Sequence, residues 1–453
     1  MTSYNAKIEE LQRIYDSNTN NLVLLYGRRG LSKHEMMRGF LSDKPSIVYL
    51  ARDCSNEVQR EFFADTVEKS CDINAVSRNY ADLFNHLRTT ESKKLVLYID
   101  HADYMMKKDP EFFENILKLK AKEFYKGPVM IIFMTESICF AEHELVDEFT
   151  REYKKFDEII KVPELNFLEV VRMYPELSEQ QAVEAYGILG GVTEYLDYWN
   201  KGATLKENVC RLILDKNAPL HNMAREYLEI ELRELGVYQT ILYALASGRE
   251  KLNDLFEYTG YSRPKISVYI KNLSKFDAVK KIESFETVGY ENAKKGVYRV
   301  NDTFLNFYYK LVFPNLSFLE VMGSEDFYDY FIEPYIPEFL DRTFVKICME
   351  SLELLSSVKR LPITIKKIGT WIGKKSNIDI IAQDDDRNTI TAKCSYSKSI
   401  FSYDMYEELM AANEEAKVNA DYKYLFSVKG FDAKLKHLES IDSTVVLVDM
   451  NEM

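Results

Sequence analysis

The stretch Leu22–Met36, LVLLYGRRGLSKHEM, decides the fold class predicted for this chain. It begins with an apolar run typical of a buried strand, passes through a turn with two glycines, and continues into residues of helical type. A strand that enters a helix through such a loop can direct backbone N–H groups at a phosphate. Binding a nucleoside triphosphate also needs a lysine for the β- and γ-phosphates and a Ser or Thr hydroxyl for Mg²⁺. The stretch therefore predicts a phosphate loop.

The loop matches the G-x-x-x-x-G-K-[ST] pattern at two of its four fixed positions. Gly27 stands at the first glycine and Lys33 at the lysine. Ser32 replaces the second glycine, and His34 replaces the residue that holds the metal. The same residues also fit an ordinary surface turn, and this alternative stays open for the loop taken alone. The candidates for binding ATP or ADP are Gly27, Arg28, Arg29, Gly30, Ser32, Lys33 and His34.

A second apolar strand, in KKLVLYIDHADYM at Lys93–Met105, ends in Asp100. A carboxylate at this position suits a residue that orients Mg²⁺, so Asp100 is the candidate metal ligand. His101 stands where ATPases of this kind usually place the Glu that activates water. A neutral imidazole can accept a proton near pH 7, but loss of the base is the simpler interpretation. Asp100 and His101 are thus catalytic candidates only, and a metal site that joins them to His34 is not predicted.

The first 165 residues alternate short apolar runs with stretches of helical periodicity. This alternation predicts a parallel sheet with helices on both faces. Strands are expected at Leu22–Tyr26, Ile47–Leu50, Leu95–Ile99, Val129–Met134 and Ile159–Val162. From Asn166 to Leu232 the pattern is helical, apart from a turn signal in GILGGVTEYL at Gly187–Leu196. A small helical subdomain should follow the sheet.

Residues Arg233–Val300 predict a winged helix. The stretch LNDLFEYTG supplies one helix, and Ser262 can cap the next helix, SRPKISVYIKNL. In that second helix, Ile266, Ile270 and Leu273 recur at helical spacing and form one buried face. The segment KKIESFETVGYENAKKGVYRV then has two strand-like runs around a polar tip, as a hairpin wing would.

The winged-helix segment is basic although the chain is acidic. Gly248–Val300 holds 11 Lys and Arg against 7 Asp and Glu, a net charge of +4, which leaves −17 for the rest of the chain. Phosphate contacts would come from the recognition helix and the wing. The candidates for DNA contact are Arg263, Lys265, Lys271, Lys294 and Lys295. A winged helix also serves as a protein-protein module, so DNA and protein partners both stay open.

The composition excludes several classes of protein. With 453 residues, of which 46% are hydrophobic and 29% charged, the chain suits two to four globular domains and lacks the signature of disorder. No apolar run approaches the roughly 18 residues of a membrane helix, and the start lacks the apolar stretch of a signal peptide. A cytoplasmic protein without a membrane partner is expected. Six cysteines without a CxxC pair predict reduced thiols rather than a disulfide framework or a zinc ribbon.

Three motifs, in this order along the chain, resemble those of predicted archaeal-type AAA+ ATPases related to the signal-transduction ATPases. YGRRGLSK at Tyr26–Lys33 resembles the family's loop, in which Gly-Arg-Arg is followed by Gly-Lys-Thr or Gly-Lys-Ser. YGILGGVTEYL at Tyr186–Leu196 looks like the lid motif, usually Leu-Gly-Gly with Pro-x-Tyr-Leu. VNDTFLNFYYKLVFPN at Val300–Asn315 is similar to the family's Asp-x-Phe-Leu-x-Phe-Trp-Tyr segment.

The resemblance covers nearly the whole chain and implies an α/β fold: a P-loop NTPase parallel sheet with a helical lid, then a winged helix and a small restriction-endonuclease-like α/β domain. The implied domains are a P-loop NTPase-like (AAA+) domain at 1–165, a lid at 166–232, a winged helix with a following aromatic helix at 233–320, and a restriction-endonuclease-like domain at 321–453.

The resemblance also implies roles for single residues. Lys33 would neutralise phosphate, and Asp100 would orient the metal. In active relatives the residue at His34 would hold Mg²⁺, and the one at His101 would be the catalytic Glu. This chain departs from the family at both positions and at Ser32. Binding of ATP or ADP, with weak or no hydrolysis, is therefore expected.

The tail departs from its implied family in the same way. Restriction-like nucleases hold Mg²⁺ with an Asp at one strand end and a Glu in the next strand, and a Lys two positions beyond polarises the water. In SNIDIIAQ, Asp379 matches, but in TITAKCSYSK the Glu has become Lys393 and the Lys has become Ser395. A helix position that often carries another Glu is Val345. Nuclease activity is not expected, and Asp379 fits a solvated carboxylate equally well, with Asp384–Asp386 as a turn.

The remaining tail predicts a mixed α/β module. The expected helices lie near Tyr335–Leu352 and at Tyr403–Val418, and the expected strands lie at Asn377–Ala382, Thr389–Tyr396, Tyr422–Val428 and Thr444–Val448. An aromatic cluster precedes this module. Its helical spacing indicates a buried face rather than a base-stacking platform, and its members are Phe304, Phe307, Tyr308, Tyr309 and Phe313. Tyr195 and Leu196 are likewise expected to pack inside the lid.

Two functions from different classes fit these patterns. In the first, the chain is an AAA+-like protein in which ATP or ADP is a regulatory or structural ligand, with DNA or a protein as its downstream partner. In the second, the chain is a nucleotide-free DNA-binding or scaffold protein whose two enzyme-like domains are both degenerate. A third, a weak nuclease or a defence factor, is opposed by Lys393 and Ser395.

Overall fold

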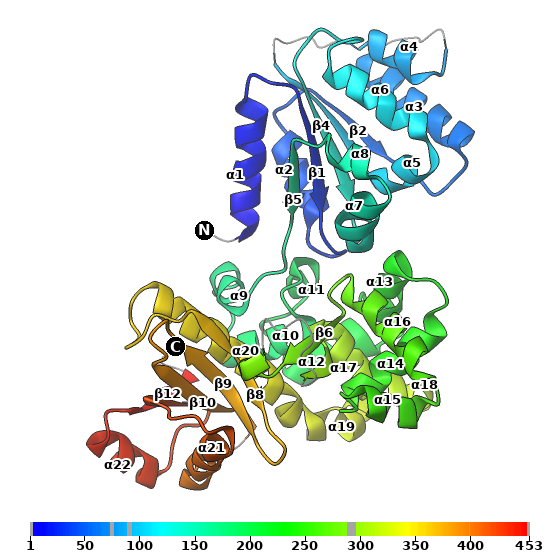
Figure 1. The fold of residues 1–453 in the computed structure, drawn as a ribbon. Coiled ribbons are helices and arrows are strands. Elements are labelled where there is room, and N and C mark those ends of the chain that lie inside the picture. Colours follow the sequence, from blue (N-terminus) through cyan, green and yellow to red (C-terminus); the bar gives the residue numbers. More distant parts are fainter. Residues whose placement is uncertain (1–2, 73–76, 88–92, 288–295, 398, 451–453) are drawn as a thin grey trace. The chain divides into compact units, whose positions relative to one another are not determined.

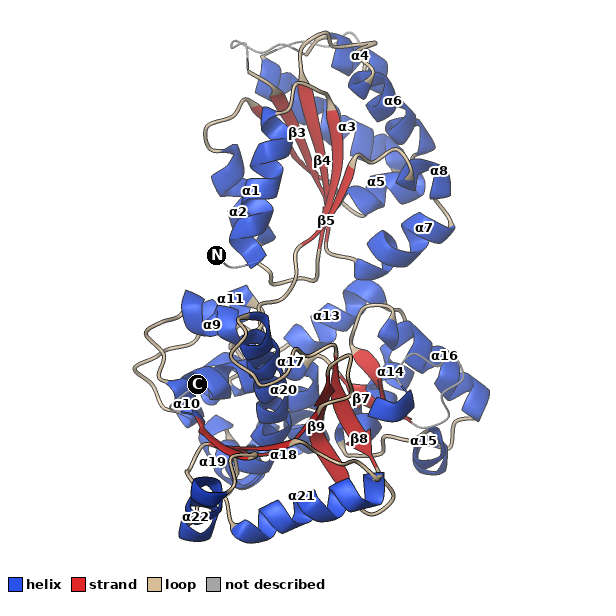
Figure 2. Cartoon of the chain, turned by 60° about the vertical axis from the view of Figure 1, so that its left-hand side comes forward, coloured by secondary structure: helices blue, strands red, loops and turns tan. Residues whose placement is uncertain are grey.

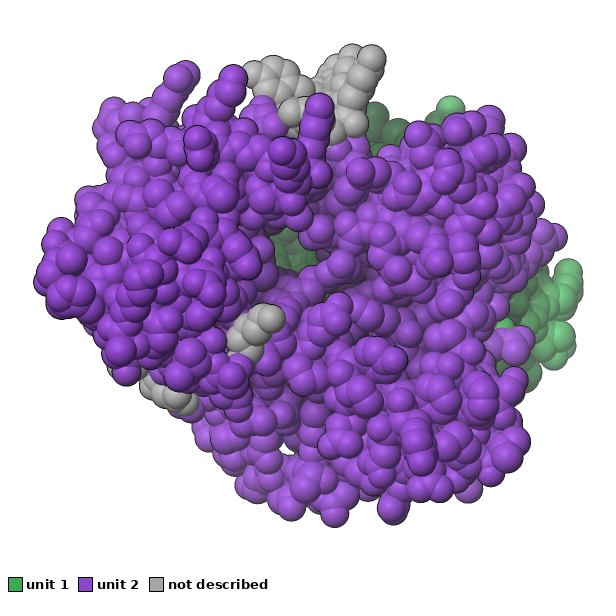
Figure 3. All heavy atoms as spheres, turned by 90° about the horizontal axis from the view of Figure 1, so that it is seen from below, with its two compact units in different colours: residues 1–164, 192–194, 227–233 green, residues 165–191, 195–226, 234–453 purple. Residues whose placement is uncertain are grey.

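A computed structural model describes residues 3–72, 77–87, 93–287, 296–397 and 399–450 of the chain. The chain forms two compact units, coloured separately in Figure 3. Unit 1 comprises residues 1–164, 192–194 and 227–233, and unit 2 comprises residues 165–191, 195–226 and 234–453. The predicted lid, 166–232, thus contributes to both units, and the division into four domains stays a prediction.

Unit 1 is built on a five-stranded parallel sheet in the order β2-β3-β4-β1-β5. Its strands are β1 Asn21–Tyr26, β2 Ser46–Leu50, β3 Leu95–Asp100, β4 Val129–Thr135 and β5 Glu158–Lys161. Every residue of β3 and β4 is buried, which is why both strands read as uninterrupted apolar runs. The predicted α/β class, with a parallel sheet and helices on both of its faces, is confirmed.

Helices cover both faces of this sheet (Figures 1 and 2). One face carries α1 Ser3–Asp16 and α2 Lys33–Leu41, and the other carries α3 Asn56–Cys71, α4 Tyr80–Asn85, α5 Ala102–Lys108 and α6 Pro110–Lys120. The short helices α7 Leu145–Asp147 and α8 Thr150–Tyr153 precede β5. Aromatic rings fill the core under α3 to α6, where Phe63 packs edge-on against Tyr80, Phe84 and Phe112.

The helical pattern predicted after the sheet is also present. Its helices are α9 Phe167–Met173, α10 Glu179–Leu189, α11 Thr193–Asp197, α12 Leu205–Val209 and α13 Met223–Glu231. Three of them begin with a capping box, in which the side chain before the helix and a Glu or Gln three residues later satisfy each other's backbone N–H groups. The capping residues are Asn166, Ser178 and Thr204.

The next part of unit 2 has the elements of a winged helix: α14 Leu235–Ala246, α15 Leu252–Thr259, α16 Arg263–Ser274, and the antiparallel pair β6 Val279–Glu283 and β7 Gly296–Val300. Gly260 ends α15 with a φ of 69°, a left-handed conformation that suits glycine. The predicted inner face of α16 is confirmed, because Ile266, Ile270 and Leu273 are all buried. The tip of the predicted wing lies outside the described residues.

A second helical stretch follows, formed by α17 Thr303–Phe307, α18 Leu316–Met322, α19 Ser324–Phe331 and α20 Ile336–Ser357. The core interpretation of the aromatic cluster holds for Phe304, Phe307 and Tyr309, which are buried, whereas Tyr308 and Phe313 are half-buried. Tyr195 and Leu196 are buried as predicted, and the Tyr195 ring lies 5.4 Å from the ring of Phe304. This cluster is therefore not a free stacking surface.

The chain ends in a mixed sheet of order β12-β11-β10-β9-β8. Its strands are β8 Lys367–Ile372, β9 Asn377–Gln383, β10 Thr389–Ser395, β11 Tyr422–Ser427 and β12 Val445–Asp449, and its helices are α21 Tyr403–Ala416 and α22 Ala433–Ile441. All four predicted strands occur. The fifth, β8, was missed because a register shift between Gly369 and Trp371 interrupts its alternation of apolar and polar residues.

Two predictions from the composition can be compared with the described residues. No helix among them combines the length and the apolar character that a bilayer span requires. None of the six cysteines forms a disulfide, and Cys139, Cys210, Cys348 and Cys394 are buried while the other two are half-buried. Four of the thiols are thus packed inside the protein as expected.

Candidate functional site

The candidate phosphate loop connects β1 to α2 at the carboxyl edge of the unit 1 sheet. Gly27 begins the loop where it passes close to the end of β5, since a Cβ atom at this position would lie 2.6 Å from the carbonyl oxygen of Val162. Gly30 has a φ of 89°. Both glycines are therefore required by the path of the backbone. Ligands of parallel α/β sheets bind outside this edge, so the loop lies where a phosphate would be expected.

Ser32 occupies the second glycine position of the motif and keeps a glycine-like backbone. Its φ of 48° and ψ of 28° are left-handed, a conformation that costs a residue with a Cβ about 1–2 kcal/mol. The Ser32 hydroxyl lies 2.8 Å from the Thr193 hydroxyl, a hydrogen bond that offsets part of this cost. Ser32 thus adopts the kind of backbone conformation that a glycine would favour at this position.

The segment 192–194, which belongs to unit 1, is hydrogen-bonded to the loop. The carbonyl oxygen of Gly30 accepts a hydrogen bond from the Glu194 backbone N–H at 2.9 Å and another from the Thr193 hydroxyl at 3.2 Å. These two residues stand in the stretch that resembles a lid motif. The loop and this stretch are therefore mechanically linked.

Lys33 is the first residue of α2, and its side chain is almost fully buried. Its ammonium group donates to the carbonyl oxygen of Arg28 at 2.6 Å and lies 3.7 Å from the carboxylate of Glu136. Burial lowers the pKa of Lys33 to about 8, although Glu136 and Asp100 oppose this shift. The lysine is thus held by the protein's own oxygen atoms, in the way a phosphate would hold it.

The two arginines of the loop differ. Arg28 is buried, pairs with Glu164 at 2.7 Å, and places its guanidinium 4.2 Å above the ring of Tyr227. These contacts hold the Arg28 side chain in place, and its part in nucleotide binding stays a prediction. Arg29 is partly exposed at the same edge of the sheet.

His34 and Asp100, 66 residues apart in sequence, form a direct hydrogen bond. The His34 Nε2 atom lies 2.7 Å from Oδ2 of Asp100, whose other oxygen accepts the backbone N–H of His101 at 2.8 Å. This hydrogen bond is the main reason why the pKa of His34 is raised above its ordinary value. Both oxygens of Asp100 are therefore engaged within the protein.

His101, the other catalytic candidate, precedes α5 with a left-handed φ of 49°. Its ring stacks on that of Tyr104, with the centroids 5.6 Å apart. Among the described residues, no group of three or more His, Cys, Asp and Glu side chains is arranged to hold a metal ion. The role of Asp100 as a magnesium ligand stays a prediction.

Two acidic residues of this edge were missed by the sequence reasoning. Glu136 directly follows β4, and the rule that polar residues after parallel strands gather at one edge would have found it. Glu231 has no local signal. Its half-buried side chain accepts hydrogen bonds from the Ser137 hydroxyl at 2.8 Å and from the backbone N–H groups of Ile138 and Cys139. Burial raises the pKa of Glu231. Residues 227–233 are thereby fastened to the segment after β4.

The predicted recognition helix α16 presents a basic surface. Arg263 donates to the side-chain oxygen of Asn253 at 3.1 Å and lies 4.1 Å above the ring of Phe256. Lys265 lies 4.4 Å from the ring of Tyr261. Lys271 is exposed. Within the described part of the chain these three cations form no ion pair, and Lys294 and Lys295 lie outside that part.

The tail shows what has replaced the nuclease pattern. Asp379 on β9 accepts the backbone N–H of Cys394 at 3.0 Å, and burial raises its pKa. The residue is half-buried, and the alternative of a solvated carboxylate stays a prediction. Lys393 pairs with Glu408 at 2.9 Å, and Ser395 is buried. A degenerate nuclease site stays a prediction. The turn at Asp384–Asp386 is confirmed by a hydrogen bond from the Asp384 N–H to the Asn388 carbonyl.

The chain is similar to one protein family and to one curated protein whose descriptions give no activity. Residues 308–414 match the DUF234 family, described as archaeal and bacterial proteins of unknown function. An uncharacterized protein of Methanocaldococcus jannaschii is 24% identical over 458 aligned positions, which cover 94% of this chain and 98% of that protein.

Two solved structures align with about two thirds of the chain. The Walker-type ATPase of Pyrococcus abyssi is 17% identical, with a TM-score of 0.47, and the alignment covers 67% of this chain and 95% of that one. The ORC2 protein of Aeropyrum pernix, solved as ADPNP-ADP complexes, is 11% identical with a TM-score of 0.47, and the alignment covers 67% and 91% of the two chains.

Proposed function

We propose that the chain binds ATP or ADP at the loop Gly27–His34, and that the nucleotide acts as a regulatory or structural ligand rather than as the substrate of rapid hydrolysis. The hydrogen bond of 2.7 Å between His34 and Asp100 carries this proposal. It ties up the carboxylate that would orient a metal ion, and it does so with the residue that stands in place of the metal-binding hydroxyl.

The binding half of the proposal rests on the loop itself. Its backbone follows the glycine-like path from β1 into the first turn of α2, where N–H groups and the helix dipole favour an anion. Lys33 stands at this turn and already neutralises oxygen atoms of the protein. A phosphate oxygen would replace the Arg28 carbonyl oxygen as the acceptor for this lysine.

The hydrolysis half rests on what surrounds the phosphate position. Attack on the γ-phosphate needs a positioned metal ion and a group that orients water. His34 offers an imidazole ring instead of a hydroxyl, and His101 stacks on Tyr104 instead of supplying a carboxylate. Bound nucleotide should therefore persist, and Mg²⁺ should add little to its affinity.

The regulatory role follows from the attachments of the loop. Gly30 and Ser32 are hydrogen-bonded to Glu194 and Thr193, the first two residues of α11. A ligand that moves this loop by a fraction of a hydrogen-bond length changes those contacts. The occupied and empty states would then differ in how firmly the start of α11 is held.

The test is calorimetric titration with ATP and with ADP, each with and without Mg²⁺. The protein should bind in the micromolar range, Lys33→Ala should abolish the heat, and Arg38→Ala, an exposed residue further along α2, should leave the affinity unchanged. Absence of binding at millimolar nucleotide would reject the proposal. A turnover of ATP well above the uncatalysed rate would reject its second half.

A second function, DNA binding without any nucleotide, is favoured by one observation. The helix α16 carries Arg263, Lys265 and Lys271 and contains no acidic residue. A mobility shift with duplex DNA at two salt concentrations should show binding that falls with salt and that Lys265→Glu weakens. Lys436→Glu, an exposed change of the same charge on α22, is the control. Equal weakening by both variants would point to a general charge effect.

A further inference from the structure

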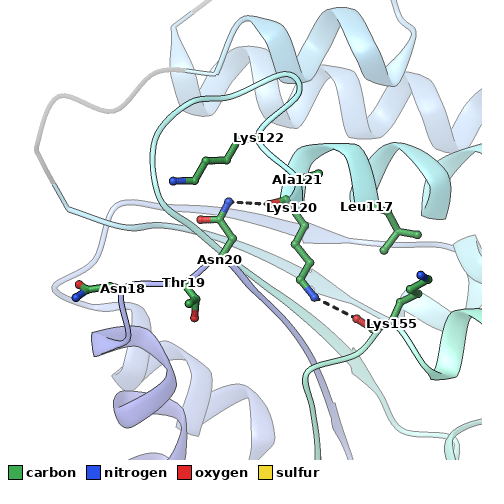
Figure 4. Close-up of a pocket in the computed structure, with 8 residues that line it drawn as sticks. All are labelled: Asn18, Thr19, Asn20, Leu117, Lys120, Ala121, Lys122 and Lys155. Atoms are coloured by element: carbon green, nitrogen blue, oxygen red, sulfur yellow. Dashed lines mark hydrogen bonds between the residues drawn. The ribbon is translucent and has the colours of Figure 1, made fainter.

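A pocket of about 510 Å³ lies at the amino-terminal edge of the unit 1 sheet, the edge opposite the phosphate loop (Figure 4). Residues 18–20, which precede β1, form one wall. Leu117 and residues 120–122 at the end of α6 form another, and Lys155 lies before β5. The volume falls in the usual range for small-molecule sites, about 300–1,000 Å³. None of these residues takes part in the proposed nucleotide site.

The walls of this pocket are held in place by partly buried hydrogen bonds. The ammonium group of Lys94, which is buried, donates to the carbonyl oxygens of Ser17 at 2.6 Å and Thr19 at 2.9 Å. The side chain of Asn20 donates to the Lys120 carbonyl at 2.8 Å and accepts the Val129 backbone N–H at 3.0 Å. The loop before β1 is thus fixed to the start of β4 and to the end of α6 without a ligand.

The pocket is basic within an acidic chain. Residues 117–126 and 151–157 together hold seven Lys and Arg against three Asp and Glu, although the net charge of the chain is −13. Lys120 is neutralised by Asp157 at 2.7 Å. Among the described residues, the ammonium groups of Lys122 and Lys155 have neither a hydrogen bond nor an ion pair. Figure 4 shows Lys122 and Lys155 at opposite ends of the pocket, with their side chains extending away from each other.

We propose that this pocket binds a small phosphate-bearing molecule, whose anionic groups are held by Lys122 and Lys155. Two strongly hydrated point charges on either side of a concave site suit a phosphate better than a planar carboxylate, for which arginine is the usual partner. A concave site also suits a small molecule better than a duplex, whose phosphates are spread along a surface. The site is independent of the proposed nucleotide function.

The test uses full-length protein that carries Lys33→Ala, so that the phosphate loop contributes no heat. Inorganic pyrophosphate and ribose 5-phosphate are the probes in calorimetric titrations. Lys122→Glu with Lys155→Glu should weaken binding by about tenfold or more, because two charge-assisted contacts become repulsive. The control is Lys118→Glu with Lys154→Glu, which makes the same change of charge on exposed neighbours that do not line the pocket, and its effect should stay below about threefold.

A variant that changes the shape of the pocket but not its charge tests whether the ligand enters the pocket. Ala121→Trp would place a large ring on the exposed wall of the pocket and should abolish binding while thermal unfolding stays unchanged. The proposal fails if the protein gives no heat with either probe at millimolar concentration. It also fails if the two double lysine variants weaken binding of the probes to the same extent. Finally, it fails if the tryptophan variant binds normally, or if duplex DNA binds through Lys122 and Lys155 more tightly than both probes.

Discussion

Gly27 should be the least replaceable residue of the phosphate loop. An added Cβ atom would lie 2.6 Å from the Val162 carbonyl oxygen and 3.2 Å from a methyl group of Leu31, whereas ordinary contacts are 3.4–4 Å. The Val162 backbone cannot retreat freely, since its N–H donates to the Tyr26 carbonyl at 2.8 Å. Such overpacking typically costs about 1–3 kcal/mol. Gly27→Ala should therefore lower the melting temperature of unit 1 by roughly 3–10 °C.

The matched control is a second glycine on the adjoining helix. Gly39 lies inside α2, and an added Cβ atom there meets nothing within 4 Å. Gly39→Ala should stabilise the helix by about 0.5–1 kcal/mol and raise the melting temperature by roughly 1–4 °C. The same chemical change should thus have opposite signs twelve positions apart.

Differential scanning calorimetry of the two variants and the parent protein measures both effects. Equilibrium unfolding in urea supplies the free energies and shows from the slope whether the unfolded state has changed. If Gly27→Ala melts at or above the temperature of the parent, the close approach of the loop to β5 does not exist in solution. If Gly39→Ala also destabilises, the comparison does not isolate the steric contact.

Three further predictions concern the carboxyl edge of the unit 1 sheet. Because the pKa of His34 is raised in the folded protein, its contribution to stability is present below the unfolded pKa of about 6.5 and is lost as pH rises through the folded pKa. The difference in unfolding free energy between the parent and His34→Ala should therefore shrink from pH 6 to pH 9. Because the ring is half exposed, this difference should stay below about 1 kcal/mol. The pKa of Glu231 is also raised, so the parent should lose stability relative to Glu231→Gln as pH rises above about 4.3. Urea unfolding of both proteins at several pH values measures this difference. A difference in unfolding free energy that does not change with pH would contradict the prediction. Finally, Ser32→Gly with His34→Thr and His101→Glu should raise ATP hydrolysis in a phosphate-release assay, and a rate equal to that of the parent would show that other residues also limit catalysis.

Several features of the fold could be predicted from the sequence because they depend on local patterns. The runs that became β1, β3 and β4 are apolar at nearly every position, as strands covered on both faces must be. The inner face of α16 follows from the spacing of Ile266, Ile270 and Leu273. The departures from the phosphate-loop pattern at Ser32 and His34 could be read directly from the sequence.

The meaning of those departures required the tertiary structure. The bond between His34 and Asp100 joins residues 66 positions apart, and the bond between Ser137 and Glu231 joins residues 94 positions apart. Lys33 is recognisable in the sequence, but its burial against the Arg28 carbonyl and Glu136 is not. The periodicity of apolar residues shows which side of a helix or strand is buried, because this pattern depends only on residues that are close together in the sequence. Which polar groups meet at one edge of a sheet depends on the strand order, and only the packed structure determines that order.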